Sequence, residues 1–235
     1  MTRVLTAAAV VLVALWVIVP FYLLLLAALT AQAAVSDYPK SFLPASLTTA
    51  PLAAFADSLG IVPATINSLA VALIAIAVAL LAGPPAAYLA ARSRGVHGLA
   101  LLGRVFPISA LAVPLAVLLV QFGWYDSVVA VGMVHAAIAL PFAVLVASPG
   151  FAPGAGTRAR ATSLGAAAGL TFLISWNEVF AASVLTLQIR TLPAQLFASL
   201  ATSPLSFKLA GALVLIVPAV VVFLLIRRSL VRVWS

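Results

Sequence analysis

The sequence lacks cysteine, and it has only four acidic and two histidine residues among 235. Without cysteine, the chain forms neither a disulfide nor a Cys-based metal or redox site. Charged residues make up 7% of the sequence, whereas apolar residues make up 66% and the mean hydropathy is +1.30. Soluble globular domains have an apolar share of roughly half. The composition therefore excludes such a domain and predicts an all-α integral membrane protein.

Six apolar runs are long enough to cross a membrane, which takes roughly 20 helical residues. Their approximate limits are 5–29, 65–91, 101–120, 128–148, 164–185 and 208–226. The first run follows Arg3 and precedes Ala31-Gln32-Ala33, as a cleavable secretory signal would. Its apolar stretch from Val4 to Leu29 is longer than the roughly 7 to 15 residues of a signal. We therefore predict a retained first span.

Basic residues are distributed unevenly over the loops of this six-span map. Nine of the twelve fall on one side, namely Arg3, Arg92, Arg94, Arg104, Arg158, Arg160, Arg227, Arg228 and Arg232. Because basic residues accumulate in cytoplasmic loops, both termini and the loops near 92–100 and 149–163 are predicted to be cytoplasmic. The net charge of +8 follows from this topology. Scattered arginines without aromatic interleaving do not predict a nucleic-acid partner.

The segment from about 30 to 64 is the only sizeable piece outside the predicted spans. Its prolines argue against one long helix, and Leu52–Ala56 is expected to form a short amphipathic turn on the membrane surface. We divide the chain into residues 1–64, the first span with this outer segment, and residues 65–235, a five-helix core.

Prolines and small residues interrupt the apolar runs. Gly83-Pro84-Pro85 is expected to interrupt the second span, and Pro107 and Pro114 the third. Transmembrane helices tolerate proline where neighbours satisfy the freed carbonyl groups, and in transporters such breaks also allow helices to bend. Small residues at Ala166–Gly169 predict close helix packing.

The triplet Trp176-Asn177-Glu178 places polar groups inside an apolar run. An unpaired carboxylate at membrane depth costs about 2.5–3.5 kcal/mol. Glu178 is therefore expected to face a solute path or to pair with a neighbour such as Asn67. Trp176 fits either an interfacial anchor or an aromatic surface for a hydroxyl-rich solute, and Asn177 fits either a helix bridge or a solute contact. Asn67, Trp176, Asn177 and Glu178 form the candidate translocation path.

Neither histidine has a second histidine or a carboxylate at metal-ligand spacing, so the sequence predicts no metal site. His135 lies in the apolar run 128–148, and we interpret it as a neutral helix-packing residue. His97 is a loop residue among arginines.

Five short motifs follow one another along the chain: Ile66–Leu69, Pro85–Arg92, Gly123–Ser127, Ala139–Ala143 and Ser175–Glu178. In order and spacing, the chain from Thr65 onward resembles the carbohydrate-uptake permeases of ABC importers, the family of the maltose transporter's inner-membrane subunits. The first 64 residues fit more loosely. The resemblance implies a type I ABC importer permease fold with about six spans, in a multi-pass protein of the inner or plasma membrane.

The resemblance also implies the partners. A second permease subunit would complete a heterodimer, an external binding protein would deliver a sugar or related polyol, and two ATPase subunits would bind ATP and Mg. Surrounding lipid is the remaining partner. This chain has no Gly-x-x-x-x-Gly-Lys-Ser/Thr loop, so it is expected to be a transport subunit and not an enzyme. Within this family the main sugar contacts often lie in the partner permease, and a related permease for glycerol phosphate is an alternative.

The loop 148–163 departs from the family pattern. Members carry there a Glu-Ala-Ala motif in a short coupling helix that docks on the ATPase, whereas this loop is shorter, lacks acidic residues and is rich in proline and glycine. Its stretch 157–161 does not offer the apolar face that a helix-in-groove contact needs. Three explanations stay open: docking through Phe151, Arg158 and Arg160, loss of the coupling segment, or residues missing from this sequence.

Two other function classes are alternatives to an importer subunit. A proton- or sodium-coupled transporter needs ionisable residues at the membrane midplane and often an internal repeat. Glu178 is the only acid within a predicted span, and no convincing repeat is present. An uncoupled remnant or a structural membrane subunit is the stronger alternative, because the coupling loop is atypical.

Overall fold

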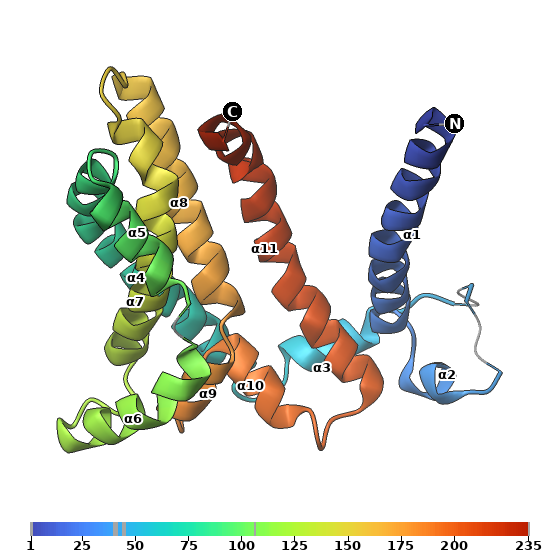
Figure 1. Ribbon diagram of the computed structural model, residues 1–235. Helices are drawn as coiled ribbons and strands as arrows, with labels where there is room; N and C mark the ends of the chain where they lie inside the picture. Colours follow the sequence, from blue (N-terminus) through green and yellow to red (C-terminus); the bar gives the residue numbers. More distant parts are fainter. Residues whose placement is uncertain (1, 40–41, 44–45, 106, 235) are drawn as a thin grey trace. The chain divides into compact units, whose positions relative to one another are not determined.

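The computed structural model describes residues 2–39, 42–43, 46–105 and 107–234, and every regular element within them is a helix (Figure 1). The elements are α1 (Thr2–Ala28), α2 (Gln32–Ser36), α3 (Ala50–Ala56), α4 (Ile61–Ala90), α5 (Arg94–Gly103), α6 (Ile108–Gln121), α7 (Val128–Ala147), the 3₁₀ turn η1 (Ser148–Phe151), α8 (Thr157–Asn177), α9 (Phe180–Leu185), α10 (Leu192–Ser199) and α11 (Leu205–Trp234). The predicted all-α class is confirmed.

Four of the described helices are long and apolar enough to cross a membrane. They comprise Arg3–Ala28, Ile61–Ala90, Val128–Phe151 and Leu205–Val231. The helices α5 and α6 meet at 82° and add a fifth span if they cross together. The exact count of six spans stays a prediction.

The chain forms two compact units. One comprises Met1–Leu59 with Ser199–Ile216, and the other comprises Gly60–Ala198 with Val217–Ser235. In the first unit, α3 buries Phe55, whose ring packs edge-on against Phe207 with centroids 5.1 Å apart. The helical turn expected near Leu52–Ala56 is thereby confirmed, whereas its place on the membrane surface and a functional boundary between residues 64 and 65 stay predictions.

In the second unit, α4, α7 and α8 pack side by side around a core made largely of alanine (Figure 1). Such small side chains allow helix backbones to approach closely. A Cβ added at Gly132 of α7 would lie 2.7 Å from Ile74 Cγ2 of α4, so this contact requires glycine. Gly169 of α8 lies against Ile226 of α11 in the same way, which confirms the close packing expected at Ala166–Gly169.

The expected break at Gly83-Pro84-Pro85 is wrong, because α4 is continuous from Ile61 to Ala90. Proline removes one N–H donor and adds steric strain, but its φ is helical, and the flanking turns of α4 pack against α7 and α8. Pro114 likewise lies within continuous α6, whereas the chain does break at Pro107, the residue that precedes α6.

The expected fifth span, 164–185, is two helices. The first, α8, begins earlier than expected at Thr157 and ends at Asn177, and α9 follows after Glu178 and Val179. Glu178 is extended, with φ −75° and ψ 122°. The carboxylate in the apolar run therefore lies at a helix break.

Candidate functional site

Glu178 caps the short helix that follows it. Its two carboxylate oxygens accept hydrogen bonds from the N–H groups of Ala181 at 2.8 Å and Ala182 at 3.0 Å. The first N–H groups of a helix have no partner within the helix, and a negative charge there is favourable. Glu178 thus satisfies backbone donors that would otherwise be unpaired in an apolar environment.

The same carboxylate lies beside His135, which is completely buried in α7. His135 Nε2 is 3.3 Å from Glu178 Oε2, a polar contact that falls short of hydrogen-bond geometry. His135 Nδ1 is 2.9 Å from the hydroxyl of Ser175. Because a carboxylate only accepts, we assign the proton of a neutral ring to Nε2, so that Nδ1 accepts from Ser175. We call His135, Ser175 and Glu178 the buried polar cluster.

The cluster corrects two interpretations of the sequence. Glu178 does not pair with Asn67, whose side-chain amide donates to the carbonyl of Arg190 at 3.1 Å. His135 is not merely a packing residue, since it is a polar partner of Glu178. The sequence signal for this pair was that Glu178 is the only acidic residue, and His135 the only histidine, within a predicted span.

Asp126 forms a second set of structural contacts, at the end of the second unit where Glu178 lies. Its carboxylate accepts the N–H groups of three consecutive residues, Leu187, Gln188 and Ile189, at distances from 2.9 to 3.2 Å. The neighbouring Tyr125 hydroxyl donates to the carbonyl of Val184 at 3.2 Å. Asp126 itself has φ +58°, a left-handed conformation that aspartate tolerates better than most residues.

We call residues 186–192 the outer strap, because the predicted topology places them on the outer side. Asp126 holds one part of it, and Asn67 and Ser68 of α4 hold the other, since Ser68 Oγ accepts the N–H of Leu192 at 2.8 Å. The predicted outer turn 123–127 therefore anchors a segment about sixty residues away in sequence. The sequence carried no signal for this role, because the strap has no motif that identifies its partner.

The environment of Asp126 favours its charged form. Burial raises the pKa of Asp126, but the three backbone N–H donors and the charge of Arg190 lower it by more. The net pKa of Asp126 therefore lies below its ordinary value.

Trp176 and Asn177 take no part in the buried polar cluster. The indole of Trp176 is 2% exposed and stacks on Phe172 with centroids 5.5 Å apart. Asn177 is exposed, and its amide donates to the carbonyl of Leu173 in its own helix at 2.8 Å. Asn67, Asn177 and Glu178 share no hydrogen bond with one another in the described structure. Their part in a solute path stays a prediction.

The loop 148–163 folds onto its own helices. The carbonyl of Phe151 accepts a hydrogen bond from Arg92 at 2.7 Å, and the guanidinium of Arg160 lies 5.1 Å from the Phe151 ring. Residues 157–161 form the first turns of α8, so no separate helix lies between η1 and α8. Arg158 and Arg160 are exposed there.

Within the described part of the chain, no group of three or more His, Asp or Glu side chains is placed to hold a metal ion. The buried polar cluster has two ionisable members, and both are engaged with each other or with the backbone. The contacts of the buried polar cluster join α7, α8 and α9.

Comparisons with known proteins complete this description. No protein-family model matches the sequence, and no curated protein matches it. Among solved structures, the chain is similar to the crystal structure of a bacterial ABC transporter involved in the import of the acidic polysaccharide alginate. The TM-score is 0.65 at 16% sequence identity, and the match covers 97% of this chain and 95% of that chain. The chain therefore shares its fold with the matched chain of this ABC transporter.

Proposed function

We propose that the chain is the permease subunit of an ATP-driven importer that moves a sugar or related polyol delivered by an external binding protein. The observation that carries the proposal is the fold match over 97% of this chain and 95% of that chain. A likeness confined to one helix pair would recur in unrelated membrane proteins, whereas this one extends over nearly the whole order of helices. The ordered motifs from Ile66 to Glu178 support the same function.

The partners in this proposal are a second permease subunit, two ATPase subunits that bind ATP and Mg, and the binding protein. The chain itself transports and does not hydrolyse ATP. The hydrogen bond between Arg92 and Phe151 brings both basic loops to one end of the second unit. Asp126 and Asn67 hold the outer strap, which contains Arg190, at another end of this unit. This separation supports a membrane orientation with the basic loops in the cytoplasm.

In the proposed mechanism, closure of the ATPase pair moves the loop 149–163 and with it the beginning of α8. A helix of 21 residues spans about 30 Å, so α8 reaches from that loop to the buried polar cluster as one element. A shift of α8 changes the contact between Ser175 and His135, and it moves the break at Glu178 near Asn67 and the outer strap. The path then opens outward.

One observation favours a second candidate, an uncoupled permease or structural subunit. Phe151 already contacts Arg92 and Arg160 of this chain, so the group most suited to enter a groove on an ATPase is engaged within the subunit. In this candidate the fold is kept, but ATPase docking is lost.

Co-purification distinguishes the two candidates. The chain is tagged, co-expressed with its genomic neighbours and purified in detergent. Stoichiometric recovery of an ATPase supports the importer, and an Arg158→Glu/Arg160→Glu variant should reduce that recovery. Recovery of the second permease subunit alone supports the uncoupled candidate. The recovered complex in proteoliposomes is then assayed for ATP-dependent uptake of oligosaccharide and of glycerol phosphate, which tests the substrate class.

A further inference from the structure

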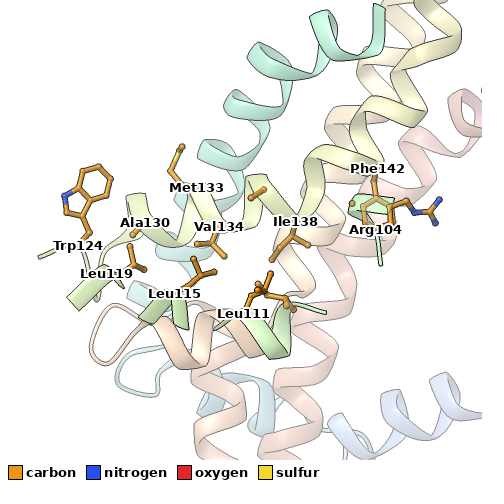
Figure 2. Close-up of a pocket in the computed structure, with 13 residues that line it drawn as sticks. Arg104, Leu111, Leu115, Leu119, Trp124, Ala130, Met133, Val134, Ile138 and Phe142 are labelled. Atoms are coloured by element: carbon orange, nitrogen blue, oxygen red, sulfur yellow. The ribbon is translucent and has the colours of Figure 1, made fainter. Parts of the chain in front are cut away.

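An apolar groove of about 420 Å³ runs between α6 and α7 (Figure 2). Its walls are formed mainly by Leu111, Leu115 and Leu119 of α6 and by Ala130, Val134 and Ile138 of α7. We call it the α6–α7 groove. None of Asn67, Trp176, Asn177 and Glu178 lines it, so it is distinct from the candidate path.

A single cation stands at one end of the groove. Arg104 lies over the ring of Phe142, with its guanidinium carbon 4.7 Å from the ring centroid (Figure 2). All four acidic residues are in the described part of the chain, and none forms a salt bridge with Arg104. Gly103, the residue before Arg104, allows the chain to approach α7 closely, because a Cβ at Gly103 would lie 3.0 Å from Pro141 Cγ. The exposed charge of Arg104 therefore lacks an anionic partner within the described structure.

The groove is about as long as half of a membrane's hydrocarbon core is thick, and it leads from Arg104 toward the predicted outer turn that holds Trp124. From Ala130 to Phe142, α7 advances about 18 Å at 1.5 Å per residue. Half of a bilayer's hydrocarbon core is about 15 Å thick. Trp124, which is 55% exposed, stands at the opposite end from Arg104 (Figure 2).

We propose that the α6–α7 groove binds one acyl chain of an anionic phospholipid, whose phosphate pairs with Arg104. The ligand must be apolar along its length and negative at one end, which describes a lipid and its headgroup. A helix of a partner subunit would offer Arg104 only the partial negative charge of a helix C-terminus, whereas a phosphate offers a full charge. The proposal requires only that the chain lies in a membrane, and it is independent of the solute and of ATPase docking.

Native mass spectrometry of the full chain in detergent tests the role of Arg104. Dioleoyl phosphatidylglycerol and dioleoyl phosphatidylcholine are titrated separately. We expect one retained phosphatidylglycerol, bound more tightly than phosphatidylcholine. Arg104→Gln should weaken phosphatidylglycerol about five-fold, the equivalent of about 1 kcal/mol. Arg94→Gln, at the other end of α5 and away from the groove, is the matched control and should bind as the wild type does.

Filling the groove tests its role independently of charge. Ala137 is exposed and lines the groove, so Ala137→Phe fills it without disturbing the core. This variant should lose binding of both lipids, whereas Ala110→Phe on α6, exposed and outside the groove, should keep it. Melting temperatures close to that of the wild type establish that each variant is folded. Unchanged lipid binding in both Arg104→Gln and Ala137→Phe would overturn the proposal.

The absence of cysteine allows a test against a protein occupant. Ala137→Cys provides the only thiol in the chain. A short cross-linker should join it to no protein when the chain is co-purified with a second permease subunit. A cross-link to that subunit would overturn the lipid assignment and show that the groove is a subunit interface.

Discussion

His135 and Glu178 are the residues whose pairing most affects the local energetics. They are 43 positions apart in the sequence, and their side chains are 3.3 Å apart with His135 fully buried. A buried polar group that loses its partner costs about 1–3 kcal/mol. Each residue therefore lowers the free-energy cost of burying the other inside an apolar bundle.

We predict that Glu178→Ala lowers the free energy of unfolding by about 1–3 kcal/mol, because it removes the acceptor of two N–H groups of α9 and the polar partner of the His135 ring. His135→Ala should also destabilise. The double variant should be less destabilised than the sum, by a coupling energy of about 0.5–3 kcal/mol. Thermal unfolding of the four proteins in detergent measures this coupling.

Asn177→Ala is the control for this cycle. Asn177 is exposed and bonds only to a carbonyl of its own helix, so its removal should change the free energy of unfolding by about 0.5 kcal/mol or less. Additive effects of the two single variants would show that the 3.3 Å contact is not an interaction. Full transport activity in Glu178→Ala would in turn argue against a role of the carboxylate in transport.

Asp126→Asn isolates the charge of the residue that anchors the outer strap. Asparagine retains an acceptor and tolerates the positive φ, so the change should destabilise by about 1–3 kcal/mol at pH 7 through weaker hydrogen bonds from Leu187, Gln188 and Ile189. The pKa of Asp126 is lowered in the folded protein from its ordinary value of 3.8. Its stabilising effect is therefore complete above that value and is lost as the pH falls through the lower, folded pKa.

The melting temperatures of wild type and Asp126→Asn should accordingly converge on acidification below about pH 4. Asp57→Asn is the control, because the Asp57 side chain is exposed and makes no hydrogen bond in the described structure. Asp57→Asn should change the melting temperature little, both at pH 7 and below about pH 4. A difference between wild type and Asp126→Asn that is constant with pH would contradict the role of the charge.

At the scale of elements, the loop 148–163 is the feature that differs most from expectation. It is folded and packed, although it is rich in proline and glycine. Gly150 makes this possible, because a Cβ there would overlap with the hydroxyl of Ser163 and lie 3.0 Å from Arg160 Cα. The turn η1 therefore rests directly on α8.

We predict that Gly150→Ala destabilises the protein by about 1–3 kcal/mol, because the added methyl group must separate η1 from α8. Limited proteolysis at Arg158 should become faster, and a second change, Ser163→Ala, should recover part of the stability. Gly165→Ala is the control: nothing lies within 4 Å of its Cβ position, so in α8 it should leave stability unchanged or raise it by up to about 1 kcal/mol. Equal effects of both glycine changes would contradict direct packing of η1 on α8.

At the scale of the whole molecule, the membrane topology predicted from the positive-inside distribution is open to a direct test. The chain has no cysteine, so single cysteines report accessibility without background. Ser36→Cys, Phe122→Cys and Thr202→Cys should react with an impermeant maleimide from outside intact cells. His97→Cys and Gly156→Cys should react only after permeabilisation, and all five positions are exposed.

Each labelled position tests particular spans. Protection of Phe122→Cys would show that α5 and α6, which meet at 82°, do not cross together. If Thr202→Cys, like Gly156→Cys, does not react with the maleimide in intact cells, α8 and α9 do not cross the membrane. A fully alternating pattern would establish the four crossings that separate these five positions, whereas the described helices give four or five candidate spans in all by length and composition.

The sequence by itself determined the helical membrane class, because apolar runs of this length have few other stable forms in lipid. It also located the polar triplet 176–178 and the short helix near Leu52, since local composition and turn residues decide both. Only the tertiary structure decided that α4 continues through Pro84 and Pro85, that Glu178 joins His135, and that Asp126 holds the outer strap. These outcomes depend on contacts between residues distant in sequence, where packing and hydrogen bonding outweigh local preference.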